Sequence, residues 1–139
     1  MLPAFVLDTS VIIKWFRQEE ILAAQALELR SSYLEGRIAI AIPSLLAYEL
    51  ANVLRYKADL STSQVEEAVQ SLFDLGLNWV LPSAEIMRLA VSLARKYEIT
   101  VYDATFIALA ELLKATFVTA DRQLISKVKS LPFVHLLGE

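Results

Sequence analysis

Short apolar runs alternate with longer amphipathic stretches along the 139 residues of the chain. A short run of consecutive or alternating apolar residues predicts a strand, whereas apolar residues recurring every three or four positions predict a helix. We therefore expect strands at 4–7, 38–42, 79–81, 99–102, 116–119 and 133–137. Helices are expected at 10–17, 20–35, from Pro43 to about 58, from 63, from 83, from Asp103 to about 114, and from Asp121.

Several helix ends carry local signals. Gly36 is expected to stop the helix over 20–35, and Pro43 suits the first turn of the next helix. Ser63 and Glu66 have the spacing of a capping box, in which each side chain accepts a backbone N–H at the helix start.

Strands that alternate with amphipathic helices indicate an α/β protein. The expected architecture is an α/β sandwich with a mainly parallel sheet, in which right-handed crossovers place helices on both faces. The length is typical of one domain, so residues 1–139 are expected to form a single domain.

Four acidic residues are expected to meet at one edge of this sheet. Asp8 ends the first strand, Asp103 follows the strand predicted at 99–102, and Asp121 comes just after the strand at 116–119. Glu49 lies one to two turns into the helix that leaves the second strand. Because ligands of such sheets bind beyond the carboxyl ends of the strands, the four carboxylates form a candidate site.

Each acid also has a structural interpretation. Asp103 and Asp121 stand at helix starts, where Asp is a favoured cap, and Asp8 could cap the short helix that follows it. Glu49 falls within an apolar stripe, where an unpartnered carboxylate is costly. It therefore needs either a metal or a cation such as Arg122.

The four acids together favour a metal. At an effective dielectric constant near 20, two ionised carboxylates in contact repel by about 4 kcal/mol. Either some of them are protonated or a divalent cation lies among them. The chain has no cysteine and one histidine, His135, so the donors are oxygens, which suit Mg²⁺ or Mn²⁺.

Composition and motifs exclude several other classes. Without cysteine, the chain has no disulfide, thiolate zinc site or cysteine nucleophile, and it contains no P-loop, GxGxxG or GxSxG motif. The net charge of −3 argues against an obligate nucleic-acid binder, but not against an enzyme that contacts nucleic acid briefly. No apolar run is long enough for a membrane span and no signal peptide is evident, so a cytoplasmic location without membrane association is expected.

The segments FVLDTSVIIKWF, PSLLAYELANVLR and TVYDATFIALAELLKATFVTADRQL carry these acids in order. Together they resemble the PIN-domain ribonucleases, and more narrowly the VapC-type toxins of toxin–antitoxin pairs. The resemblance implies a three-layer α/β/α sandwich around a mainly parallel sheet of about five strands. It also implies that Asp8 and Asp103 are the principal metal ligands. Glu49 and Asp121 would complete the acidic pocket, so that all four are metal-binding and catalytic. It further suggests that the hydroxyls of Thr9, Ser10 and Thr119 hydrogen-bond the carboxylates or the substrate phosphate.

The resemblance also implies a function. The protein would be a Mg²⁺- or Mn²⁺-dependent endoribonuclease, hydrolysing RNA through a metal-activated water. It would be the toxin of a type II toxin–antitoxin system, form a homodimer and bind a cognate antitoxin. Among the cations, Lys14 and Arg122 are the candidates for attracting RNA, because each is close in sequence to an acid of the site.

Two alternatives remain open on the sequence alone. One is a catalytically silent PIN-like module that binds RNA or protein. The other is a nuclease that processes RNA, or cleaves DNA, outside a toxin–antitoxin pair.

Overall fold

The computed structural model, which describes residues 1–139, has a central sheet of parallel strands. Its strands are β1 (Ala4–Leu7), β2 (Ala39–Pro43), β3 (Asn78–Val80), β4 (Thr116–Thr119) and β5 (Val134–Leu136). The five strands lie in the order β3-β2-β1-β4-β5, and every neighbouring pair is parallel. In the middle of the sheet, Val6 pairs with Ala41 on one side and with Phe117 on the other. The predicted parallel sheet is therefore confirmed.

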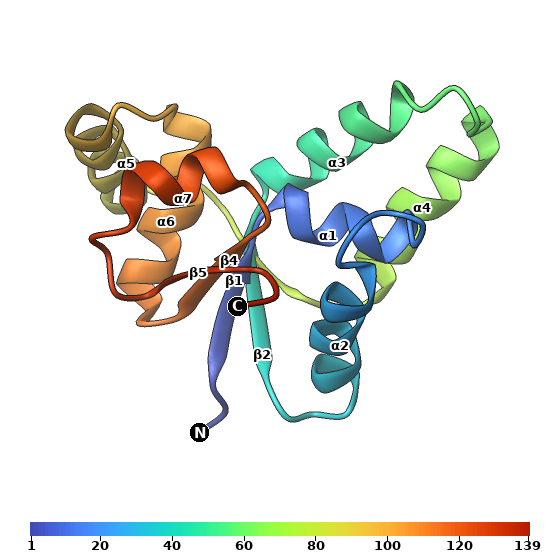
Figure 1. The fold of residues 1–139 in the computed structure, drawn as a ribbon, viewed down its shortest axis with the longest axis horizontal. Helices are drawn as coiled ribbons and strands as arrows, with labels where there is room; N and C mark the ends of the chain where they lie inside the picture. The colour runs from blue at the N-terminus through green and yellow to red at the C-terminus, as the bar shows by residue number, and fades with distance from the viewer.

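Seven helices flank the sheet. They are α1 (Thr9–Phe16), α2 (Ala23–Leu34), α3 (Leu45–Arg55), α4 (Thr62–Asp74), α5 (Ala84–Tyr97), α6 (Val101–Leu113) and α7 (Arg122–Val128). Figure 1 shows α1 to α4 on one side of the sheet and α5 to α7 on the other, as expected for three layers. No helix has both the length and the apolar content needed to cross a membrane.

The hydrophobic core lies on both faces of the sheet and is centred on β1 and α6. Val6 and Leu7 of β1 are fully buried. Residues 104–110 of α6 are all buried as well, because this helix is enclosed between α5 and the central strands. A helix buried over two consecutive turns is held rigidly, which fixes the position of the side chains at its first turn.

The segment at 99–102 differs from the sequence-based expectation. It forms no strand: α6 begins at Val101, and the Thr100 side chain accepts a hydrogen bond from the Asp103 N–H at 3.0 Å. The β-branched and aromatic residues of this segment favour a strand by propensity, but the cap and the packing of α6 outweigh that preference.

Three helix ends also differ. The capping box of α4 uses Ser61 and Gln64 rather than Ser63 and Glu66, so the helix starts at Thr62. Pro43 ends β2 instead of opening the next helix. The second helix begins at Ala23 rather than near 20, after a left-handed residue at Leu22.

The fold creates a notch above the carboxyl ends of the central strands. In Figure 1 the pair formed by α3 and α4 leans away from the group formed by α5, α6 and α7, and the tops of β1 and β4 lie between them. The chain order reverses at β1, whose neighbours are β2 and β4. This is the position at which parallel α/β sheets bind ligands.

Candidate active site

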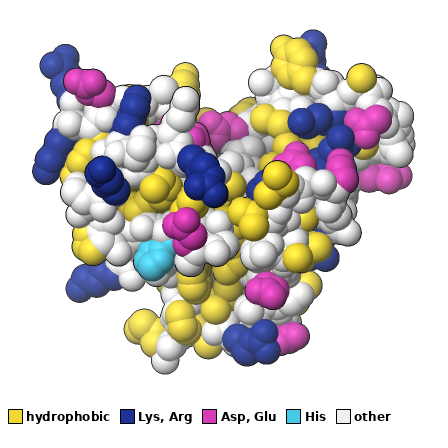
Figure 2. Space-filling model, in the orientation of Figure 1, with side chains coloured by type: hydrophobic (Ala, Val, Ile, Leu, Met, Phe, Trp, Pro, Cys, Tyr) yellow, Lys and Arg dark blue, Asp and Glu magenta, His cyan; other side chains and the backbone are white.

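All four acids predicted from the sequence line a single cavity of about 290 Å³ in this notch. Asp8 directly follows β1, Glu49 lies on α3, Asp103 on the first turn of α6, and Asp121 caps α7. In Figure 2, acidic side chains are visible in the notch between the two groups of helices. The convergence holds even though Asp103 arrives from a helix start and not from the end of a strand.

Asp8 is the most deeply placed of the four, with 6% of its surface exposed. Its two carboxylate oxygens accept hydrogen bonds from Ser10 Oγ at 2.5 Å and from Thr119 Oγ1 at 2.6 Å. These hydroxyls in turn accept backbone N–H groups, that of Ala120 at 2.8 Å and that of Asp121 at 3.1 Å. Since each hydroxyl oxygen accepts a hydrogen bond from a backbone N–H, its own O–H donates to Asp8.

The electrostatic balance at Asp8 is unfavourable to its charge. Burial raises the pKa of Asp8 to about 6, although the hydrogen bonds from Ser10 and Thr119 act to lower it. The neighbouring charge of Asp103 raises it further. The carboxylate is therefore ionised at neutral pH at a cost in free energy.

Glu49 is half-buried on α3, whose buried residues Leu46, Leu50 and Leu54 fix the helix on the core. Its Oε1 accepts a hydrogen bond from Thr9 Oγ1 at 2.7 Å. Burial raises the pKa of Glu49, the Thr9 bond lowers it, and the charge of Asp103 raises it again. No cation forms an ion pair with Glu49, so the alternative of a partner such as Arg122 is wrong.

Asp103 and Asp121 lie at helix starts and also line the cavity. The pKa of Asp103 is raised mainly by burial and secondly by the charge of Asp121. Thr100 and the charge of Lys127 act to lower it. Asp121 Oδ1 accepts the Leu124 N–H at 3.1 Å and so caps α7. The structural interpretation of Asp121 is thus correct, and its second oxygen is not engaged by that cap.

No lysine or arginine lines the cavity. Lys14, expected to attract RNA, is largely buried and forms an ion pair with Glu20 at 3.3 Å, so that expectation is wrong. Arg122 is exposed at the start of α7, beside Asp121, and takes part in no ion pair. Of the two predicted cations, Arg122 is therefore the one that remains unpaired.

Sequence reasoning missed three further residues of the cavity, Asn52, Val53 and Phe106. Asn52 and Val53 lie three and four positions after Glu49 on α3, and Phe106 lies three positions after Asp103 on α6. Residues three or four apart share a helix face, so this spacing is the signal that could have found them.

The donor set suits a hard divalent cation. All side-chain donors of the cavity are oxygens, apart from the Asn52 amide nitrogen. Burial is the largest cause of the raised pKa values of Asp8, Glu49 and Asp103, and none of these three carboxylates forms an ion pair. The oxygen donors around the cavity therefore fit Mg²⁺ or Mn²⁺ in chemical type. Their spacing in this structure does not form a ligand group of three or more acids.

Residues 5–130 match the family model described as the PIN domain. Over 94 residues, covering 63% of this chain and 70% of the relative, the sequence is 38% identical to Ribonuclease VapC3 of Pyrobaculum aerophilum.

The fold is shared with solved toxin–antitoxin structures. VapBC2 of Rickettsia felis, solved with a DNA fragment from its promoter, aligns with a TM-score of 0.69 and 21% identity, covering 96% of each chain. A toxin–antitoxin complex from Klebsiella pneumoniae aligns with a TM-score of 0.67 and 20% identity, covering 94% of each chain.

Proposed function

Because the chain belongs to the PIN-domain family, we propose that it is a divalent-metal-dependent endoribonuclease and the toxin of a type II toxin–antitoxin pair. The observation that carries the proposal is the cavity lined by Asp8, Glu49, Asp103 and Asp121 with no cation among them. A module that only binds RNA gains nothing from clustered negative charge, which repels the phosphate backbone. The 38% identity to a protein named a ribonuclease supports the same activity.

In this proposal Asp8 and Asp103 hold the ion, and Glu49 and Asp121 complete the pocket. A bound divalent ion would lower the pKa of the attacking water and would stabilise negative charge on the leaving oxygen. Ser10 and Thr119 keep both oxygens of Asp8 in a fixed orientation. The deep, hydrogen-bonded position of Asp8 thus serves to place a ligand without reorganisation.

The other two acids are suited to accept a proton from the attacking water. Glu49 engages Thr9 through Oε1, which leaves Oε2 free, and Asp121 caps α7 through Oδ1, which leaves Oδ2 free. Either free oxygen can act as the general base, and no histidine is required. Arg122, which is exposed and directly follows Asp121, attracts the phosphate of the RNA.

We also propose a homodimer and a cognate antitoxin as partners, in the cytoplasm where RNA is present. An apolar cavity of about 330 Å³ lies between the start of α3 and the α5–α6 pair. Tyr48, Leu81 and Tyr102 line it, with 76%, 74% and 62% of their surfaces exposed. Exposed apolar residues gathered in this way support a protein–protein contact. The antitoxin is supported by the shared fold with toxin–antitoxin complexes.

The test of the activity is cleavage of a structured RNA pool by wild type and Asp103→Asn in Mg²⁺, Mn²⁺ and EDTA. Asp59→Asn is the matched control, because Asp59 is an exposed acid outside the cavity. We expect cleavage by wild type and Asp59→Asn, lost in EDTA and in Asp103→Asn. Equal cleavage by all three proteins would contradict the proposal, and binding of RNA without cleavage would favour a silent module.

The toxin role has a separate test. Expression of the wild type in growing bacteria should arrest growth, and co-expression of the small protein encoded beside it should restore growth. Cleavage in vitro without toxicity would instead favour a nuclease of RNA processing.

A further inference from the structure

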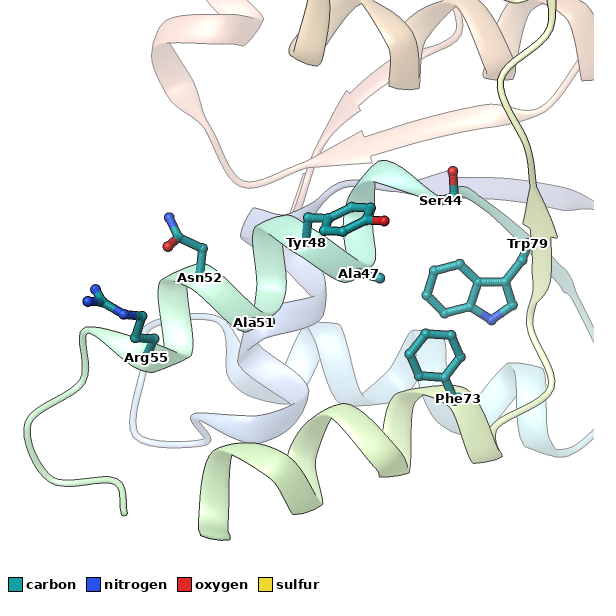
Figure 3. A pocket seen from close by; sticks show the side chains of 8 residues that line it. All are labelled: Ser44, Ala47, Tyr48, Ala51, Asn52, Arg55, Phe73 and Trp79. Carbon is teal, nitrogen blue, oxygen red and sulfur yellow. The ribbon is translucent and has the colours of Figure 1, made fainter. Parts of the chain in front are cut away.

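The α3 helix borders a second hollow, on the side that faces α4. This groove has a volume of about 600 Å³ and lies between α3, the end of α4 and β3. Its wall on α3 is formed by the small side chains of Ala47 and Ala51, which face Phe73 and Trp79 across the gap (Figure 3). Small residues on one helix opposite large rings leave room for a flat group.

The aromatic residues of the groove form a stacking surface. The rings of Phe73 and Trp79 are stacked, with centroids 4.7 Å apart and an interplanar angle of 11°. Phe73 keeps 49% of its surface exposed, and Tyr48, on the α3 rim, keeps 76% exposed. Exposed aromatic rings beside an open groove are the surfaces on which proteins stack unpaired nucleobases.

The charge of the groove is opposite to that of the carboxylate cavity. Its only charged residue is Arg55, and no Asp or Glu lines it. Arg55 is exposed, lies over the Tyr56 ring at 4.4 Å and forms no ion pair. A guanidinium of this kind is free to bind a phosphate.

The groove adjoins the carboxylate cavity. Asn52 lines both, and Tyr48 immediately precedes Glu49 on the same helix. At 1.5 Å per residue, α3 advances about 9 Å from Glu49 to Arg55. A strand whose phosphate lies at the carboxylates can therefore reach the groove with the nucleotides next to it.

We propose that this groove, named here the α3–α4 groove, binds an unpaired nucleobase of the RNA strand beside the scissile phosphate. The base stacks on the Phe73–Trp79 pair, and Arg55 binds a neighbouring phosphate. The proposal rests on the ribonuclease function and adds to it a preference for single-stranded RNA. Stacking accepts every base, so the groove supplies affinity and strand position rather than sequence choice.

The test uses the fluorescence of Trp79. The chain has two tryptophans, and Trp15 is 2% exposed, so a change caused by a ligand reports on Trp79. Octaadenylate RNA is titrated into Asp8→Asn protein in Mg²⁺, a background chosen to prevent cleavage. We expect saturable quenching of the fluorescence as bases stack on the ring.

Two variants in that background locate the binding. Phe73→Ala removes half of the ring pair, and Arg55→Gln removes the cation; we expect each to weaken RNA affinity about fivefold or more. The matched controls are Val91→Ala and Arg88→Gln on α5, since Val91 is 50% exposed and Arg88 is exposed. These should leave the affinity unchanged, and thermal unfolding shows whether each variant is folded. Arg55→Gln keeps the test valid if Phe73→Ala fails to fold.

The outcomes separate this proposal from the function on which it rests. If the wild type cleaves RNA but RNA causes no quenching, or both groove variants bind like the controls, the groove proposal is overturned and the ribonuclease stands. Unchanged RNA affinity together with loss of antitoxin binding would assign the groove to protein and also overturn it. If the wild type does not cleave and no RNA binds, the ribonuclease proposal fails, and the groove proposal with it.

Discussion

The two ends of α1 hold charged residues in opposite ways. At its C-terminal end, Arg17 lies 2.8 Å from Asp59 and 2.8 Å from Glu19, and Lys14 pairs with Glu20. The hydrogen bond from Arg17 lowers the pKa of Asp59. At the N-terminal end, Asp8 faces other acids, and its pKa is raised.

This difference shows which charges serve the fold. Exposed ion pairs such as Arg17–Asp59 satisfy their charges within the protein and contribute modestly to stability. The carboxylate cavity gathers charges that the protein itself leaves unpaired, which makes the folded state less stable than it could be. Perturbed carboxylates collected in a cleft are typical of functional sites.

The largest expected effect is on activity in Asp8→Asn. The substitution replaces one carboxylate oxygen by an amide NH₂. It thereby removes the charge of a proposed metal ligand. We expect RNA cleavage to fall by more than about a hundredfold, beyond the loss typical of groups that only support a ligand. Cleavage kinetics and circular dichroism measure activity and fold. Full activity in the folded variant would contradict the assignment of Asp8.

The next effect is the pH dependence of stability without metal. The pKa of Asp8 is about 6 in the folded protein and near 3.8 in the unfolded chain. Between these values the folded state binds more protons, so its stability falls as the pH rises from about 4 to about 6 and stays low above. The shift corresponds to roughly 3 kcal/mol at neutral pH.

Thermal unfolding of wild type and Asp8→Asn in EDTA checks this sign. The Tm of Asp8→Asn should rise relative to that of wild type between pH 4 and pH 7, because only the wild type carries the carboxyl group that titrates over this range. The absolute difference in Tm also includes the loss of one hydroxyl hydrogen bond, since the amide NH₂ cannot accept it. The raised pKa values of Glu49 and Asp103 act in the same direction in the wild type. A difference in Tm that is independent of pH would show that burial does not raise the pKa of Asp8.

The smallest effects come from a matched pair of neutralising substitutions. Glu49→Gln keeps an oxygen to accept the Thr9 hydrogen bond but removes the repelling charge, so its Tm without metal should rise by a few degrees. Asp59→Asn removes the charge paired with Arg17, so its Tm should fall slightly, and less so at high salt. A large loss of stability in Glu49→Gln would show that Glu49 has a structural role that its contacts do not reveal.

The sequence predicted the sheet well because its central strands are short apolar runs with clear ends. Ala4–Leu7 and Thr116–Thr119 form strands with the predicted bounds. The segment at 99–102 failed for the opposite reason. Its residues favour a strand locally, whereas the Thr100 cap and the enclosure of α6 by α5 and the sheet make it a helix start.

The carboxylate cavity was predictable because acids at strand ends and helix starts are brought together by the topology of the sheet. The contacts of the charged groups near the cavity were harder to predict. Lys14 pairs with Glu20, which comes from the loop after α1, and no local pattern indicates that contact. Asn52 and Phe106 depend on which face of each helix turns toward the cavity.

We expect the unpaired carboxylates of the cavity to bind a divalent cation. The most direct measurement is the change in Tm on adding Mn²⁺ at pH 7 to wild type, Asp103→Asn and Asp59→Asn, against sodium chloride of equal ionic strength. At a Mn²⁺ concentration about 100 times the dissociation constant, binding stabilises the folded state by about 2.7 kcal/mol. The Tm of wild type and Asp59→Asn should rise clearly, and that of Asp103→Asn should change little. Equal rises in all three proteins, or none in the wild type, would contradict this expectation.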